Sequence, residues 1–201
     1  MRIIIGIDEV GRGPLAGPVS VGVVSCEEKI YKKLKNDRRL PSAGKDSKKL
    51  TASDRKKYSD FLKILQMEGK ISYKIVHISN KIIDAKGLSF SIKKAIKDGM
   101  GGLNIEPKYC EVRLDGGLKA PEIFKLQRTI IKGDEKEKII AWASILAKVS
   151  RDEIMYKAER KFPRYDLGNN KGYGTLKHRE AIKDRGLSTF HRVSFCKNLI
   201  Y

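Results

Sequence analysis

The sequence predicts an α/β protein in which strands and helices form layers, followed by a helical C-terminal extension. Two apolar runs near the start, residues 3–5 and 18–26, are rich in Ile and Val, as is typical of buried strands. Further strand patterns then alternate with segments of helical periodicity, which is the order of layered α/β domains. After residue 160 the strand patterns give way to a loop and one more helix. We therefore expect a main domain over residues 1–160 and an extension over residues 161–201 packed on it.

The elements of the first half follow from apolar spacing and from loop-forming residues. The first strand starts in the Ile run and is closed by two adjacent acids, and the second places three valines on one face. A basic segment containing Pro and Gly follows and is at least partly loop. Either Thr51 or Ser53 can cap the next helix, which runs through Met67. The strands are expected at 3–9, 18–26 and 71–78, and the basic segment at 29–49.

The second half predicts three helices and two short extended segments. The first helix ends at Gly99, and Gly87 and Ser89 weaken its middle. The second helix carries a stripe of Ala, Ser and branched residues, which implies close packing against a sheet. Thr175 can cap the last helix. In order, these elements are expected at 80–98, 109–114, 126–131, 139–158 and 175–185.

The net charge favours a polyanionic partner. The chain has 43 Lys and Arg against 24 Asp and Glu, a formal charge of +19, and a pI near 9.8. Nucleic acid is the first candidate and an anionic membrane surface the second. A merely lysine-rich surface is the alternative that composition alone leaves open.

Location is predicted from what the sequence lacks. No apolar run approaches the roughly 20 residues that span a bilayer, and the first strand follows directly after Met1-Arg2 without a signal peptide. The three cysteines show neither a disulfide framework nor zinc-ligand spacing, so we read them as buried thiols. We expect a cytoplasmic protein with no membrane association.

Acidic side chains stand where three apolar runs end. Asp8 and Glu9 close the first strand, Asp115 closes the strand before a Gly-Gly turn, and Asp134 follows Gly133 before the long helix. Acids at strand ends can converge on one edge of a sheet. Carboxylate oxygens are the ligands that Mg²⁺ prefers, and two such ions can drive phosphodiester cleavage. The sequence therefore predicts a metal site at this edge.

Each acid also has a structural interpretation. An Asp beside Gly is commonly a turn residue or a helix cap. For Asp134 capping is as good an explanation as catalysis, and for Asp115 the turn interpretation is weaker. Asp8 and Glu9 are the hardest to explain structurally, because buried charge is costly unless it is paired or binds metal. Directly after them, the segment Gly11-Arg12-Gly13 offers a backbone that a ligand can approach closely.

The chain resembles the ribonuclease HII family, the type 2 ribonucleases H. The most specific match is the segment GIDEVGRGPLAGPV, which covers residues 6–19. Weaker matches follow in the right order over nearly the whole chain. They are DSKKL at 46–50, LDG at 114–116, GD at 133–134, ASILAKV at 143–149, RD at 151–152, KGYGT at 171–175 and HRVSF at 191–195.

The resemblance implies a ribonuclease H-like fold, a central mixed β-sheet flanked by helices, whose catalytic domain is residues 1–160. It implies an endonuclease that uses Mg²⁺ or Mn²⁺, two ions in the reactive complex, on the RNA strand of RNA–DNA hybrids. It also implies incision 5′ of single ribonucleotides embedded in duplex DNA, leaving 3′-hydroxyl and 5′-phosphate ends. The metal ligands and catalytic residues carried over are Asp8, Glu9, Asp115 and Asp134. We expect a monomer whose partner is nucleic acid.

The resemblance also assigns substrate contacts. The Gly-Arg-Gly turn, Gly11, Arg12 and Gly13, would read the ribose, because a site built to bind a hydroxyl rejects a sugar that lacks it. Arg12 can grip a phosphate with its planar fork. Tyr173 would stack on the deoxyribose beside the ribonucleotide, although without the family a packing aromatic is the better interpretation. The remaining phosphate contacts, which a solvated loop explains nearly as well, are Lys45, Ser47 and Lys48.

Several residues keep open interpretations. His178 and His191 are read as structural or hydrogen-bonding residues. Lys148 either extends its charge to solvent or approaches the site, and Asp152 is read as an ion-pair partner rather than a fifth ligand. Trp142 departs from the small residues usual at this place in the family, so it needs a pocket.

Two rival functions remain at this point. Another nuclease of the same broad fold, such as a type 1 ribonuclease H or a Holliday-junction resolvase, would share the acids but require a different substrate. A non-enzymatic, basic nucleic-acid-binding module would carry the same acids for structural reasons.

Overall fold

The protein is built on one mixed five-stranded sheet. The computed structural model describes residues 2–40, 50–103 and 105–200. Strands run in the order β3-β2-β1-β4-β5. The pairs β3–β2 and β2–β1 are antiparallel, whereas β1–β4 and β4–β5 are parallel. The strands are β1 (Ile3–Val10), β2 (Val19–Glu27), β3 (Ser72–Ile78), β4 (Cys110–Asp115) and β5 (Gln127–Ile130).

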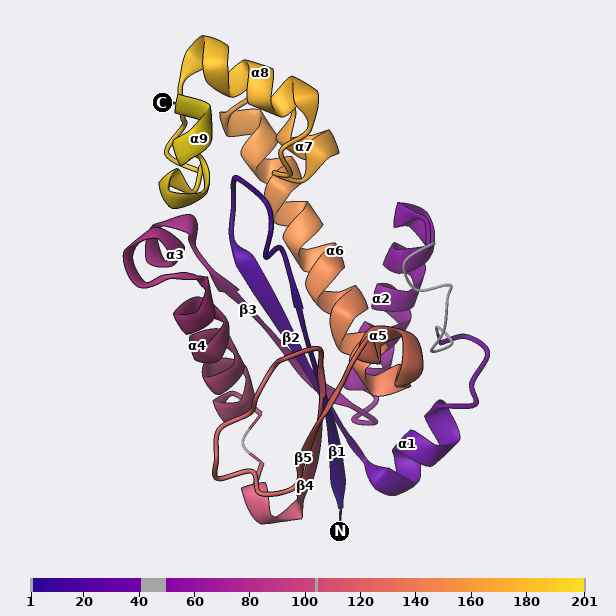
Figure 1. The fold of residues 1–201 in the computed structure, drawn as a ribbon. Helices are drawn as coiled ribbons and strands as arrows, with labels where there is room; N and C mark the ends of the chain where they lie inside the picture. The colour runs from indigo at the N-terminus through magenta and orange to yellow at the C-terminus, as the bar shows by residue number, and fades with distance from the viewer. Residues whose placement is uncertain (1, 41–49, 104, 201) are drawn as a thin grey trace.

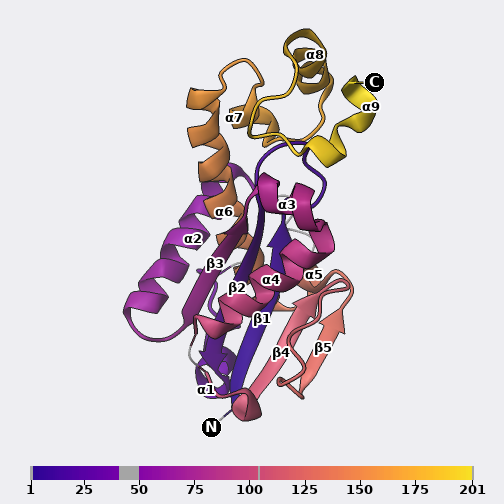
Figure 2. The same cartoon turned by 90° about the vertical axis from the view of Figure 1, so that its left-hand side faces the viewer.

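Helices cover both faces of this sheet (Figure 1, Figure 2). On one face lie α1 (Glu28–Leu34), α2 (Ala52–Met67) and α6 (Lys138–Lys161), and on the other α3 (Asn80–Lys86) and α4 (Leu88–Gly101). The side chains of β1 alternate between the two apolar layers, so the first strand is buried on both faces as its Ile run predicts. The fold is therefore the expected α/β sheet flanked by helices.

Helix α6 approaches the sheet closely enough to touch its backbone. A Cβ placed on Gly6 of β1 would lie 2.3 Å from the carbonyl oxygen of Ile139, and one on Gly22 of β2 would lie 2.3 Å from that of Ala143. Glycine at these two positions is what lets the helix sit this near. The close packing expected from the small residues of this helix is confirmed, and it brings the first turns of α6 against β1 and β2.

The C-terminal residues form a third apolar cluster beyond the sheet (Figure 2). They include the helices α7 (Leu167–Asn170), α8 (Leu176–Arg185) and α9 (Lys197–Ile200). Ala16 from the β1–β2 loop and Met155 from α6 belong to the same cluster. The helical extension thus packs on the loop that follows β1, while a division of the chain at residue 160 stays a prediction.

The structure differs from some of the expected elements and decides between alternatives at others. The helix expected at 80–98 is two helices, because Gly87 adopts a φ of +82° between α3 and α4. Helix α1 was missed because its lysines obscure the pattern of its buried residues. Thr51, not Ser53, caps α2 by accepting from the backbone N–H of Asp54. Strand β1 continues one residue past the two acids that were expected to close it, to Val10.

Three short helical segments complete the description. These are α5 (Gly133–Lys136), directly before α6, and the two 3₁₀ turns Pro107–Tyr109 and Val193–Phe195. Within the described residues, no helix combines the length and the apolar content that crossing a membrane requires.

Candidate metal centre and nucleic-acid site

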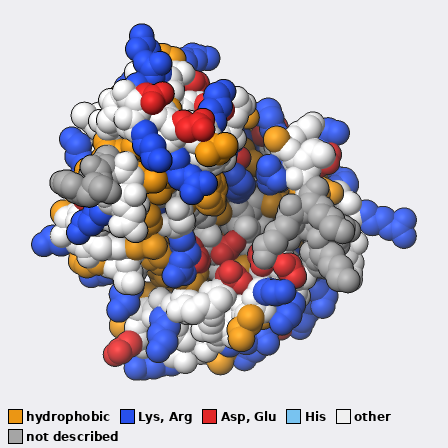
Figure 3. Space-filling model, turned by 45° about the horizontal axis from the view of Figure 1, so that its top comes forward, with side chains coloured by type: hydrophobic (Ala, Val, Ile, Leu, Met, Phe, Trp, Pro, Cys, Tyr) orange, Lys and Arg blue, Asp and Glu red, His pale blue; other side chains and the backbone are white. Residues whose placement is uncertain are grey.

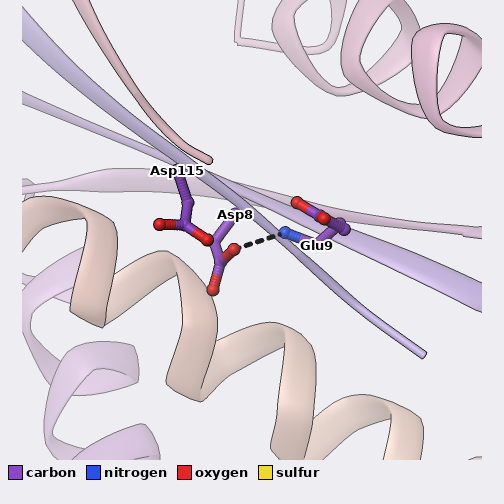
Figure 4. Close-up of side chains that lie close together, drawn as sticks. All are labelled: Asp8, Glu9 and Asp115. Carbon is purple, nitrogen blue, oxygen red and sulfur yellow. Dashed lines mark hydrogen bonds between the residues drawn. The ribbon is translucent and has the colours of Figure 1, made fainter. Parts of the chain in front are cut away.

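Three carboxylates meet at the junction of two parallel strands. Ile7 of β1 is paired with Leu114 of β4, and each is followed by an aspartate, Asp8 and Asp115. Asp8, Glu9 and Asp115 each offer an oxygen within 4.8 Å of the others (Figure 4). Convergence of acids at this sheet edge, as the sequence predicts, is confirmed for these three.

The site makes Asp8 hard to ionise. Asp8 is only 4% exposed, and burial raises the pKa of its carboxyl well above the usual range. A hydrogen bond with Ser144 acts against this shift, while the nearby charges of Glu9, Asp115 and Asp134 add to it. The backbone N–H of Glu9 also donates to Asp8 Oδ1 at 2.8 Å. A bound cation would favour the ionised form.

Glu9 shows that the cluster fits a divalent metal. Burial raises its pKa, and the hydrogen bond from Arg12, with Nη1 2.8 Å from Oε1, works in the opposite direction. Its other oxygen, Oε2, is buried and has no hydrogen-bond partner among the described residues. A buried carboxylate oxygen without a partner is costly unless something binds it. Oxygen donors of this kind are the ligands that Mg²⁺ and Mn²⁺ take.

Asp134 lies beside this cluster but is not one of the three. It is in the first turn of α5, is 7% exposed, and lines the same cavity. The backbone N–H of its neighbour Gly133 donates to Asp115 Oδ1 at 2.5 Å, which ties α5 to the end of β4. The first residue of α6 is Lys138, so Asp134 does not cap the long helix. It contributes negative charge to the site, as its effect on Asp8 shows.

The acids form the floor of a cavity of about 420 Å³. On the face shown in Figure 3, acidic side chains occupy a hollow with lysine and arginine side chains around it. Negative charge in the floor suits metal ions, and positive charge at the rim suits the phosphates of a polyanion. The lining residues include Asp8, Glu9, Gly11, Arg12, Gly13, Arg55, Asp115, Asp134, Ser144, Lys148 and Tyr173.

The Gly-Arg-Gly turn, residues 11–13, lines the cavity; buried Arg151 packs against it and buried Arg192 is hydrogen-bonded to it. Gly11 has a φ of +89°, and a Cβ there would lie 2.3 Å from Nε of Arg151. Arg192 donates to the carbonyl oxygens of Gly11 at 2.7 Å and Arg12 at 2.9 Å. Both arginines are fully buried. Neither arginine was assigned a role from the sequence. For Arg151 there was a signal, because it is a charged residue within the apolar stripe of the long helix.

Tyr173 lines the same cavity and lies next to the Gly-Arg-Gly turn. Its residue is 45% exposed, and its ring is 3.9 Å from where a Cβ of Gly13 would stand. The ring therefore lies in contact range of the turn with nearly half of its residue exposed, instead of filling a core, as a substrate contact would require. The other predicted phosphate contacts, Lys45, Ser47 and Lys48, lie outside the described residues.

The structure resolves most of the open interpretations. Lys148 lines the cavity, and its Nζ lies 2.6 Å from Oδ1 of Asp152. Asp152 is therefore an ion-pair partner, as expected. Trp142 is completely buried and packs edge-on against Tyr31, with 5.7 Å between ring centroids. The two C-terminal histidines are buried and hydrogen-bonded to each other.

A mixed sheet with carboxylates at the end of its central strands, set in a cavity with a basic rim, defines a metal-dependent enzyme of the nuclease class. The ribonuclease HII family model matches residues 5–198. The chain is 39% identical over 199 residues to ribonuclease HII of Caldicellulosiruptor bescii, covering 99% of this chain and 89% of the relative. It is 40% identical over 199 residues to ribonuclease HII of Clostridium beijerinckii, covering 99% and 69%. The chain belongs to the ribonuclease HII family, hydrolytic endonucleases that act on RNA–DNA hybrids.

A solved structure supports the fold independently. Ribonuclease H2 from Pyrococcus horikoshii OT3 superposes with a TM-score of 0.74 at 24% identity, covering 98% of this chain and 96% of that one. The family membership excludes the non-enzymatic binding module and the other nucleases of this broad fold as alternatives.

Proposed function

We propose that the protein cuts the RNA strand of RNA–DNA hybrids and also incises 5′ of single ribonucleotides in duplex DNA, leaving 3′-hydroxyl and 5′-phosphate ends. The observation that carries the proposal is the meeting of Asp8, Glu9 and Asp115 within 4.8 Å in the cavity that the Gly-Arg-Gly turn lines. In this proposal the metal ligands and the residues that recognise the sugar line the same cavity.

Asp8, Glu9, Asp115 and Asp134 are proposed to hold two divalent cations, Mg²⁺ or Mn²⁺. Bound there, the ions would supply an activated water and stabilise the leaving oxygen. The protein's own contribution is to hold the carboxylates in place: Gly133 fixes one oxygen of Asp115, and Ser144 and the Glu9 backbone orient Asp8. Glu9 leaves one buried oxygen free for a ligand.

The Gly-Arg-Gly turn is proposed to read the ribose. With no Cβ at Gly11 and Gly13, the backbone can bring its polar groups within reach of a 2′-hydroxyl, which both donates and accepts. A deoxyribose would leave those groups unpaired, so it would be rejected. Arg12, whose side chain is 58% exposed, is proposed to contact a neighbouring phosphate.

Tyr173 is proposed to stack on the sugar that follows the ribonucleotide. Its exposed ring faces Gly13, so a ribose at the turn and a deoxyribose at the ring can be contacted together. The basic surface would add affinity that is independent of sequence and sensitive to salt. Lys45, Ser47 and Lys48 are proposed to add phosphate contacts, and we propose that the protein acts as a cytoplasmic monomer.

The decisive experiment uses a duplex that holds one ribonucleotide, beside a uniform RNA–DNA hybrid. We expect cleavage of both with Mg²⁺ or Mn²⁺ present, and mapped ends that place the cut 5′ of the ribonucleotide. Asp115→Asn should nearly abolish both cleavages while retaining hybrid binding. Normal turnover by this variant, or cleavage that needs a tract of several ribonucleotides, would refute the proposal.

A further inference from the structure

The segment that joins α8 to the C-terminal turn is attached to both loops that line the cavity. Its backbone bonds to the loop after β1: Arg192 N–H donates to the Leu15 carbonyl at 2.7 Å, and Gly17 N–H donates to that of Phe190 at 2.9 Å. Leu15 N–H in turn donates to the Gly172 carbonyl at 2.7 Å, next to Tyr173. Three segments distant in sequence therefore meet beside the cavity.

Arg192 donates hydrogen bonds from all three of its guanidinium nitrogens to backbone carbonyls of the loop after β1. Its Nη2 and Nη1 donate to the carbonyls of Gly11 and Arg12, and its Nε donates to that of Gly17 at 2.9 Å. The residue is fully buried, and desolvation lowers its pKa to about 10. Burying a cation against neutral carbonyls costs stability. The cost has an explanation if function requires the Gly-Arg-Gly turn, which carries two of these carbonyls, to be held in one position.

His191, the preceding residue, is connected to the second loop through His178. The backbone N–H of Ser188 donates to His191 Nδ1 at 3.0 Å, so the neutral ring carries its proton on Nε2. That Nε2 lies 3.0 Å from His178 Nε2, which must accept. His178 then carries its proton on Nδ1 and donates to the carbonyl oxygen of Tyr173 at 2.9 Å. Every group in this chain of bonds has one consistent role.

We infer that His191 and Arg192 together are positioning residues that fix the distance between the Gly-Arg-Gly turn and Tyr173, and thereby set the preference for a single ribonucleotide over a uniform hybrid. The inference rests on the proposed function, because it takes both loops as substrate contacts. A single ribonucleotide must be read at the turn while its neighbouring deoxyribose is read at Tyr173. A uniform hybrid presents a ribose in every register and depends less on that spacing.

The test compares kcat/KM on the single-ribonucleotide duplex with kcat/KM on the uniform hybrid. For Arg192→Met we expect this ratio to fall about tenfold or more, because small displacements of contacting groups are costly. Arg192→Lys, which retains a donor and the charge, should restore part of it. The affinity for Mn²⁺, measured by calorimetry, should stay that of the wild type.

A second pair of variants tests the histidine connection without altering Arg192. His178→Asn retains an amide donor for the Tyr173 carbonyl, whereas His178→Leu does not. We expect the substrate ratio to fall with Leu and to be largely kept with Asn. Leu65→Ala, a buried position in the apolar cluster on the α2 side, is the control for stability loss alone and should leave the ratio unchanged.

The outcomes separate the two proposals. Equal loss on both substrates, an unchanged ratio, or the same fall in the Leu65→Ala control would overturn the positioning role. Wild-type protein that fails to incise the single-ribonucleotide duplex would overturn the proposed function and this inference with it.

Discussion

Arg12 donates a hydrogen bond to Glu9 across the junction between β1 and the Gly-Arg-Gly turn, with Nη1 2.8 Å from Oε1. The Arg12 side chain is 58% exposed, and that of Glu9 is 8% exposed. One guanidinium therefore offsets the charge of a carboxylate in the metal site and is also the proposed phosphate contact. Its two roles should be separable by mutation.

Removing Arg12 should tighten metal binding while weakening substrate binding. In Arg12→Ala, the carboxylates lose a neighbouring positive charge, so we expect Mn²⁺ to bind about two- to fivefold more tightly, as suits a pair worth up to about 1 kcal/mol. The KM for hybrid should rise because a phosphate contact is lost. Calorimetric titration with Mn²⁺ at neutral pH measures the first effect and steady-state kinetics the second.

Arg2→Ala is the matched control for this prediction. Arg2 has a 55% exposed side chain and is 3.8 Å from a carboxylate oxygen of Glu111. Because Glu111 is not part of the acidic cluster, removing the Arg2 side chain should change neither the affinity for Mn²⁺ nor the KM for hybrid. Weaker Mn²⁺ binding by Arg12→Ala would show that Arg12 orients Glu9 more than it competes with the ion.

Asp8→Asn should stabilise the metal-free protein while abolishing cleavage. The raised pKa of Asp8 means that the folded state resists its ionisation, so the charge costs stability at neutral pH. We expect a higher Tm than wild type in a chelator, by a few degrees. Mg²⁺ should raise the Tm of wild type and have little effect on the variant.

Asp37→Asn serves as the opposite case. Hydrogen bonds from Arg39 lower the pKa of Asp37 to about 2, so its charge is favourable in the folded state. That variant should have a Tm equal to or below wild type. If Asp8→Asn also lowered the Tm in chelator, the carboxylate would not be a destabilised group and its role as a ligand would lose support.

Gly11→Ala should disrupt the turn by more than backbone strain. A positive φ costs a residue with a Cβ about 1–2 kcal/mol, and at Gly11 the new atom would also collide with Arg151. We expect loss of single-ribonucleotide cleavage together with a lower Tm. Gly69 has a φ of +68° with nothing within 4 Å of an added Cβ, so Gly69→Ala should show the strain alone and keep its activity. Equal behaviour of the two variants would contradict the collision.

How far the sequence predicted the site can be judged from particular residues. Asp8 and Asp115 were predictable because apolar strands that end in acids direct them to one edge of a sheet. Arg192 was not, because nothing local distinguishes a buried arginine from a surface one. Its three acceptors are carbonyls at residues 11, 12 and 17, which come together with it only in the folded chain.

The fold shows the same limit. Gly87 was recognised as a weak point in a helix, but whether the helix bends or breaks there depends on the φ it adopts when α3 and α4 pack on the sheet. The hydrogen bond between His178 and His191 could not be read from their spacing, since it depends on the turn after α8. Local patterns predict the elements, whereas contacts between remote loops arise from packing.

The three histidines should make the protein less stable in acid. Burial lowers the pKa of His191 to about 4 and also lowers those of His178 and His77. In the unfolded chain a histidine titrates near pH ~6.5. Between these values the unfolded state binds more protons than the folded state, so stability falls as the pH falls from about 6.5 to about 4.

Asp8 and Glu9 must be removed from this measurement because their raised pKa values have the opposite effect: these groups take up a proton in the folded state as the pH falls. We therefore expect the Tm of the double variant Asp8→Asn, Glu9→Gln in chelator to fall continuously over that range. Adding His178→Asn and His191→Gln should make the fall shallower, since only His77 of the three then titrates. A slope that these substitutions leave unchanged would mean that other groups cause the acid sensitivity. It would also mean that the histidine pair takes up a proton while folded, which requires the hydrogen bonds of His191 to His178 or Ser188 to rearrange, since both ring nitrogens of a protonated histidine donate.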